Sequence, residues 1–191
     1  MKNPYKDHEL VILPQTDAQK ALQNGLIELM KNKDINNISV KELCSNSNVA
    51  RSTFYAYYNT LNDLLDEIED RLVANISKLD DKIINEQRND PKDFVYFDEI
   101  LKYLIQNKSI FLTLLSKQYD HHLIIKWKKA IKAHLWQRYF FKVKTNRLDL
   151  LLEMVASEAI AGFIFFLEHP DKVNETSVYK IVAHTLTIFD L

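Results

Sequence analysis

Apolar residues recur every three or four positions along most of this chain, which is the period of an α-helix rather than of a β-strand. Residues 17–32 carry one such stripe, made of Ala18, Ala21, Leu22, Gly25, Leu26, Leu29 and Met30. A longer stripe covers 61–88, and further helical patterns cover 94–107, 109–117, 119–143, 147–168 and 174–190. The pattern therefore predicts an all-α protein.

Residues 39–58 predict two short helices joined by a tight turn. Ser39 is a good N-cap residue, and Glu42 follows at the position that completes a capping box. Asn48 tolerates the left-handed backbone that such a turn requires. A second capping box, Thr60 with Asp63, is expected to start the next helix.

The second short helix, Arg51 to Tyr58, divides its side chains between two faces. At about 100° per residue, one side carries Phe54, Tyr57 and Tyr58. The other side carries Ser52, Tyr55 and Ala56, flanked by Arg51 and Thr53. A short turn followed by a helix with a polar outward face predicts a helix-turn-helix.

This segment resembles the DNA-binding motif of the TetR family of transcriptional regulators. The matching residues are Val49, Arg51, Thr53, Phe54, Tyr55, Tyr58, Asp63, Leu64 and Leu65. The resemblance implies an N-terminal three-helix DNA-binding bundle followed by a six-helix C-terminal dimerisation and ligand domain. We therefore expect an arm at 1–16, the helix-turn-helix domain at 17–60 and the C-terminal domain at 61–191.

Three positions depart from the family pattern. Asn48 replaces the glycine of the turn, and Ala50 replaces the usual Ser or Thr cap of the recognition helix. Leu61 stands where the family commonly has a basic residue that contacts a phosphate. The rival interpretation is a TetR-like helical interaction or co-regulator protein with weak or lost DNA binding.

The resemblance implies double-stranded DNA as a partner, with a palindromic operator bound by a homodimer that acts as a repressor. It places Ser39, Val40 and Lys41 at the phosphates. It places Arg51, Ser52, Thr53, Tyr55, Ala56 and Tyr57 on or near the groove-facing helix. Arg51 is the best candidate for a guanine contact, because its guanidinium matches the two acceptors of that base. Lys2 and Lys6 of the arm are expected either to reach a DNA groove or to belong to a mobile terminus.

The last two predicted helices are apolar around most of their circumference, so each must be covered on most sides. The resemblance implies that they pair with their twofold mates. The candidate dimerisation residues are Val155, Ala159, Gly162, Phe163, Phe166, Val182 and Phe189. The alternative is a helix pair buried within one subunit.

Many aromatic residues lie between these regions, and by default they belong to the core. A small-molecule effector, if one exists, is expected to contact Phe111, Trp136 and Phe140. The basic tract 126–147 has three interpretations. It is a solvated helix face paired with the acids of 63–70, a site for an anionic ligand, or a contact with DNA or another protein.

The amino-acid composition further limits the classes of function that the chain can have. Two glycines and four prolines favour long helices, and a net charge of −1 requires any nucleic-acid binding to come from a local patch. Cys44 is the only cysteine, which argues against a disulfide framework. No nucleophile elbow and no Gly-rich phosphate loop occur, so we expect neither an enzyme nor a cofactor.

Metal binding and membrane insertion are not expected from the sequence. Adjacent His121 and His122 would point about 100° apart on a helix and are poor joint ligands, although with His134 they could join carboxylates at a site. We expect no apolar stretch to approach the length of about 18–20 residues that a membrane span needs. The start of the chain does not resemble a signal peptide, so a cytoplasmic protein is expected.

Overall fold

The computed structural model describes residues 3–5, 13–85, 95–118, 120–137 and 147–174, together with 177 and 180. Within these residues the chain is helical and contains no strand, which confirms the all-α prediction. Most of the predicted helix 174–190, including Val182 and Phe189, lies outside the described residues. The elements are α1 (Asp17–Met30), η1 (Ile35–Asn37), α2 (Val40–Asn46), α3 (Arg51–Tyr57), α4 (Leu61–Asn85), α5 (Val95–Gln106), α6 (Lys108–Phe111), the π-helical segment η2 (Leu112–Lys117), α7 (His121–Leu135) and α8 (Leu148–Glu168).

Side-chain caps fix the starts of the N-terminal helices, including the start after Ser39 that the sequence predicted. Thr16 and Gln19 form a capping box at α1. The Oγ of Ser39 accepts a hydrogen bond from the Glu42 amide at 3.1 Å and starts α2. These bonds satisfy amide groups that have no partner within the helix, and so they set the helix boundaries.

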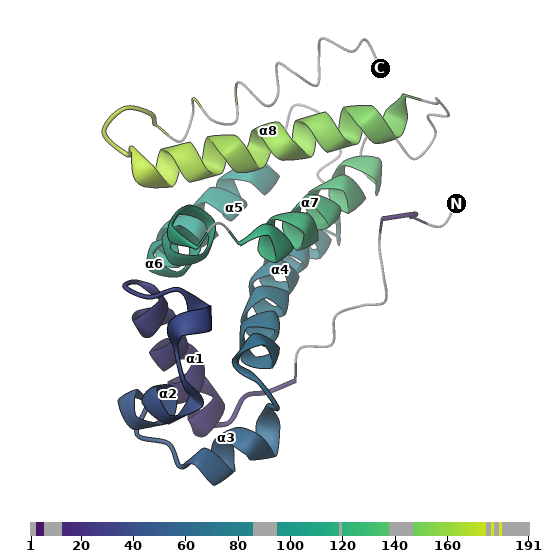
Figure 1. The fold of residues 1–191 in the computed structure, drawn as a ribbon. Helices are drawn as coiled ribbons and strands as arrows, with labels where there is room; N and C mark the ends of the chain where they lie inside the picture. The colour runs from purple at the N-terminus through teal and green to yellow at the C-terminus, as the bar shows by residue number, and fades with distance from the viewer. Residues whose placement is uncertain are drawn as a thin grey trace.

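Helix α4 connects the two parts of the molecule. Helices α1–α3 form a small bundle at one end of α4, and α8 crosses the other end of the molecule (Figure 1). Helix α4 packs against α1, α5 and α7. Its buried apolar face belongs to a single core that continues from α1 to α8, and its members on α4 are Leu64, Ile68, Leu72, Val73 and Ile76.

A charged cluster lies where α4 packs against α7. The ammonium of Lys126 is 2.8 Å from both Asp66 and Asp70 and 2.9 Å from Glu69. Burial and then the neighbouring Asp120 carboxylate, against the pull of Lys126, raise the pKa of Glu69 to about 7. Burial opposes the charge on Lys126, but its three carboxylate partners outweigh that effect and raise its pKa.

The predicted pairing of the basic tract 126–147 with the acids of 63–70 is thus confirmed for Lys126. Two further lysines pair elsewhere, with Glu153 on α8: Lys128 at 2.8 Å and Lys132 at 2.7 Å. Their hydrogen bonds hold the pKa of the Glu153 carboxyl below its usual range. These three lysines therefore join helices, which weakens the case for an anionic ligand at this end of the tract.

Helix α8 buries the side that we predicted for a dimer seam. Val155, Ala159 and Phe163 are fully buried within one chain, and Phe166 is 7% exposed. Only Gly162 of the described candidates is partly exposed. The face that a partner could reach instead carries Leu150, Met154 and Phe165, at 62%, 50% and 45% exposure. Because the helix is apolar on both faces, its sequence pattern does not decide which face a partner would meet.

The expectation that no segment is apolar enough for a membrane span was wrong for α8. By length and composition this helix qualifies, with a mean hydropathy of 2.0, and 50% of its most apolar window is buried in the fold. A core helix of a soluble protein meets the same criteria, so this is weak evidence for a membrane location.

The described part of the N-terminal arm contacts the C-terminal helices rather than the recognition helix. Asn3 donates to the Ala133 carbonyl at 2.8 Å, and the Tyr5 hydroxyl hydrogen-bonds with Asp149. Arg71 of α4 donates to the Leu13 carbonyl at 2.9 Å. The arm therefore links α4, α7 and α8; Lys2 and Lys6 lie outside the described residues.

An aromatic stack forms the centre of the C-terminal core. Trp127 lies parallel to Phe163, with ring centroids 5.6 Å apart and an interplanar angle of 6°. Phe111 contacts Trp127 at 5.5 Å. Phe111 and Trp136, both predicted to line an effector pocket, are buried at 0% and 6% exposure, whereas Phe140 lies outside the described residues.

Replacing Trp127 by alanine should destabilise the protein strongly, because it removes a fully buried ring and leaves a cavity between two aromatic neighbours. We expect a loss of about 3–5 kcal/mol in the free energy of unfolding. Urea denaturation followed by circular dichroism measures this loss. Ile125→Ala on the same helix, 51% exposed, is the control and should change stability by less than about 0.5 kcal/mol. Equal losses in the two variants would contradict this picture of the core.

Candidate nucleic-acid interface

The turn between α2 and α3 depends on one left-handed residue. Asn48 has φ 52°, the only positive φ among the described non-glycine residues. The Val49 amide then donates to the Cys44 carbonyl at 3.0 Å and closes the end of α2. Asparagine thus performs the role of the usual glycine, as predicted. Ala50 makes no side-chain cap at α3, also as predicted.

Two aromatic side chains anchor α3 to the bundle. Phe54 is fully buried, and Tyr58, just after the helix, is 5% exposed. The Tyr58 hydroxyl donates to Glu67 of α4 at 2.7 Å. Burial, followed by this hydrogen bond to Glu67, raises the pKa of Tyr58 to about 12. Helix α3 is therefore held both by apolar contact and by a polar bond to α4.

The outward face of α3 carries most of the residues proposed to contact DNA. Arg51, Ser52 and Ala56 are exposed, Thr53 is half-buried, and Tyr55 is 58% exposed. The prediction that Tyr57 lies on the inner face with Phe54 was wrong, because Tyr57 is 44% exposed. Tyr57 is the last residue of α3, and Tyr58 after it has an extended backbone, so the helical period no longer places the two side chains on one face. This exposure suits its other predicted role, beside the groove.

Positive charge on this surface is sparse. Lys41 on α2 and Arg51 on α3 are exposed, and Ser39 is exposed beside them, whereas Val40 is half-buried. Lys33 forms an ion pair with Glu42, which holds the pKa of that carboxyl below its usual range. Leu61 packs against the core rather than facing outward.

A close helix crossing sets the position of α2. A Cβ added at Gly25 of α1 would lie 2.0 Å from the Ser47 Oγ and 3.3 Å from the Leu43 Cδ1. The glycine therefore permits α1 and α2 to approach, which explains why it is tolerated within a helix despite its low helix propensity. The sequence placed Gly25 in the apolar stripe but did not reveal its neighbour.

Contacts between the bundle and the C-terminal part were not predicted. Gln118, just after η2, donates to the carbonyls of Met30 at 2.6 Å and Lys33 at 3.0 Å. Lys117 donates to the Lys31 carbonyl at 3.0 Å. These bonds cap the carboxyl end of α1 from a segment more than eighty residues away, and no local sequence pattern could have indicated them.

Solved structures share this architecture. A TetR transcriptional regulator from Streptococcus agalactiae 2603V is similar with a TM-score of 0.67 and 23% identity, over 87% of this chain and 92% of the other. A TetR transcriptional regulator from Rhodococcus sp. RHA1 gives 0.59 and 13%, over 90% and 94%. A protein described as the dihydroxyacetone kinase operon activator DhaS gives 0.57 and 18%, over 90% and 95%. Protein-family models and curated protein sequences gave no match.

The chain therefore has the fold of TetR-type transcriptional regulators. The likeness extends over both the helix-turn-helix bundle and the C-terminal helices, since it covers 87% of the chain. At these identities it shows the fold, and the role of individual residues must be argued from the site itself.

The bond between Tyr58 and Glu67 predicts a dependence of stability on alkaline pH. The pKa of Tyr58 is raised from 10.0 to about 12, so the fold favours the neutral phenol. Its stabilising effect should be complete below pH 10 and should be lost as the pH rises toward 12. Tyr58→Phe should lower stability by about 0.5–1.5 kcal/mol at neutral pH and should weaken this alkaline loss.

Urea denaturation at several pH values measures both effects. Tyr55→Phe is the matched control, because Tyr55 is 58% exposed and should behave as the parent protein does. The same alkaline loss in Tyr58→Phe as in the parent would assign that loss to another group.

Proposed function

We propose that this protein is a cytoplasmic DNA-binding transcriptional regulator and not an enzyme. The observation that carries the proposal is the division of side chains on α3. Phe54 and Tyr58 anchor the helix, while Arg51, Ser52, Tyr55 and Tyr57 face outward from a rigid support. A short exposed helix held after a tight turn is the geometry that enters a major groove.

The DNA contacts would divide by chemistry. Ser39 and Lys41 at the start of α2 would contact phosphates and fix the position of the protein on the duplex. Arg51 opens α3 and is exposed, so its guanidinium would reach a guanine edge, with Ser52, Thr53, Tyr55, Ala56 and Tyr57 near the groove. Because few cations surround this face, we expect a small number of phosphate contacts and a shallow dependence on salt.

A homodimer would place two recognition helices on a palindromic operator. We move the proposed seam to the exposed side of α8. At about 100° per residue, Leu150, Met154, Ala161 and Phe165 fall within one narrow stripe, and all four are exposed in the single chain. An apolar stripe of this kind on an otherwise buried helix favours pairing with a second copy. Gly162, beside the stripe, would allow a close approach.

Repression is the simpler proposal for the direction of control, because a bound dimer can block transcription by occupying a promoter. Activation requires an additional surface for the transcription machinery. A similar structure is described as an operon activator, so the fold accommodates both directions.

A small-molecule effector, if it binds, would act within the C-terminal core near Phe111 and Trp136. Trp127, which contacts Phe111, has a buried indole Nε1 without a hydrogen-bond partner, which offers a polar group for orienting a ligand. A shift of η2 would reach α1 through Gln118. The ligand must bind the DNA-free arrangement more tightly, because only differential affinity moves an equilibrium.

The rival function is a helical interaction protein that keeps the fold without DNA binding. The sparse positive charge around α3, the uncapped Ala50 and the inward Leu61 favour it. Selection of bound fragments from genomic DNA tests the two functions directly. Failure to retain any duplex at low salt would support the interaction protein.

Arg51→Ala should weaken binding to a selected operator by about 1–3 kcal/mol and relax the base preference at one position in each half-site. A gel shift with the operator and single-base variants measures both effects. Lys102→Ala on α5 is the charge-matched control, since its side chain is 62% exposed and lies outside the helix-turn-helix. An equal loss on every DNA sequence would assign Arg51 to a phosphate.

Phe165→Glu should convert a dimer into a monomer, because pairing would bury an unpaired carboxylate, at a cost of several kcal/mol. Operator affinity should fall with it, since two half-sites would no longer be held together. Sedimentation velocity measures the assembly state. Ile105→Glu, at a comparable exposure of 43% on α5, is the control and should leave the dimer intact. A dimeric Phe165→Glu variant would place the seam on another surface.

A further inference from the structure

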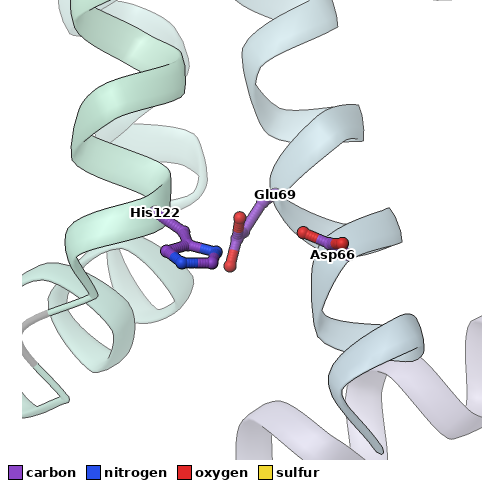
Figure 2. A group of neighbouring side chains, drawn as sticks. All are labelled: Asp66, Glu69 and His122. Carbon is purple, nitrogen blue, oxygen red and sulfur yellow. The ribbon is translucent and has the colours of Figure 1, made fainter. Parts of the chain in front are cut away.

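Three possible metal ligands meet between α4 and α7. Asp66 and Glu69 come from α4, and His122 comes from the first turn of α7 (Figure 2). One ligand atom of each lies within 4.8 Å of the others. Figure 2 shows the His122 ring and the Glu69 carboxylate facing one another in the space between the helices.

The helix geometry explains why these three side chains meet. Asp66 and Glu69 are three residues apart, so they share one face of α4. On the other side, the Asp120 side chain accepts from the Leu123 amide at 3.1 Å and fixes the start of α7. The capped start of α7 therefore places His122 beside α4, whereas the adjacent His121 points about 100° away.

Negative charge exceeds positive charge in this cluster. The Lys126 ammonium contacts three carboxylates, from Asp66, Glu69 and Asp70, and a fourth carboxylate, from Asp120, lies close to Glu69. The Glu69 side chain is only 3% exposed. Its Oε2 is 2.9 Å from the Lys126 ammonium, and the Asp120 Oδ2 is buried without a hydrogen-bond partner. Buried carboxylate oxygens of this kind need a cation or another donor to offset the loss of hydration.

We infer that Asp66, Glu69 and His122 bind a divalent transition metal ion that joins α4 to α7. One imidazole nitrogen and two carboxylate oxygens form a mixed donor set that suits Zn²⁺ or Mn²⁺. The two sides of the site belong to different helices, so the ion would stabilise their packing. The sequence made His121 and His122 poor joint ligands but left open that they join carboxylates at a site, and of the two only His122 lies in this cluster.

Lys126 competes for the same carboxylates. Its ammonium contacts Asp66, Glu69 and Asp70, and its side chain is 27% exposed on a flexible stem. When a divalent ion binds, the ammonium would move to Asp70, which is 41% exposed and not one of the three ligands. Lys126 would then act as the cation that holds the cluster together when metal is scarce.

His134 does not take part, although the sequence allowed it to join a metal site. It lies three turns further along α7, about 18 Å from His122 along the helix axis, and is 1% exposed in the core. The site thus depends on one histidine, so a substitution of His122 is its most direct test.

The test uses the full chain treated with a chelator and then titrated with ZnCl₂, MnCl₂ or MgCl₂ in a calorimeter. We expect one Zn²⁺ per chain and a melting temperature that rises with Zn²⁺ concentration. His122→Gln should weaken Zn²⁺ binding by about tenfold or more. His121→Gln, the neighbouring histidine on the same turn, is the matched control and should bind as the parent does.

Lys126→Met tests whether Lys126 competes with the metal ion for the carboxylates or only neutralises their charge. It should tighten Zn²⁺ binding, because the rival cation is gone, even if it lowers the stability of the metal-free protein. Circular dichroism of each variant confirms that it is folded. This experiment contains no DNA, so its outcome is independent of the proposed regulatory function.

Three outcomes would overturn the inference. Zn²⁺ that neither binds nor raises the melting temperature would leave Lys126 as the only cation of the cluster. Equal affinity in His122→Gln and the parent would show that the ion binds elsewhere. Mg²⁺ binding as tightly as Zn²⁺, without dependence on His122, would show general screening of acidic charge.

Discussion

Helix α4 packs against α1 in the helix-turn-helix bundle and against α5 and α7 in the C-terminal part. Its buried residues, from Leu64 to Ile76, belong to one continuous core. Because protein interiors are close-packed, a displacement at one end of such a helix must be accommodated at the other. The bonds from Gln118 and Lys117 to the end of α1 add a second connection between the same two parts. The orientation of the recognition helix therefore depends on packing far from any DNA surface.

Helix α3, the proposed recognition helix, exposes little charge. Phe54 and Tyr58 use their burial to fix α3, and the Tyr58 hydroxyl extends that support to α4 through Glu67. The exposed surface of α3 is short and mostly neutral, with Arg51 as its main charged group. A rigid helix with few cations favours specificity from individual contacts over general attraction to the phosphate backbone.

The same pair of helices that carries the apolar core also carries the densest charge in the described part of the chain. Lys126 lies among carboxylates of α4, and Glu69 is almost fully buried there. Burying ions rarely adds net stability, but it penalises any arrangement that separates the partners. This polar contact thus favours the arrangement of α4 against α7 in which Lys126 meets its three carboxylates.

The sequence by itself determined the local structure, because caps and turns depend on residues only a few positions apart. Ser39, Asn48 and the Thr60–Asp63 pair fixed the helix-turn-helix, and the stripe from Leu64 to Ile76 fixed the inward face of α4. Tertiary structure decided what periodicity could not. Helix α8 is apolar on both faces, so only packing against its neighbours showed which face is buried and which one, with Met154 and Phe165, is exposed. The meeting of Glu69 with His122 across two helices was equally invisible, because it depends on how α4 and α7 are placed in space.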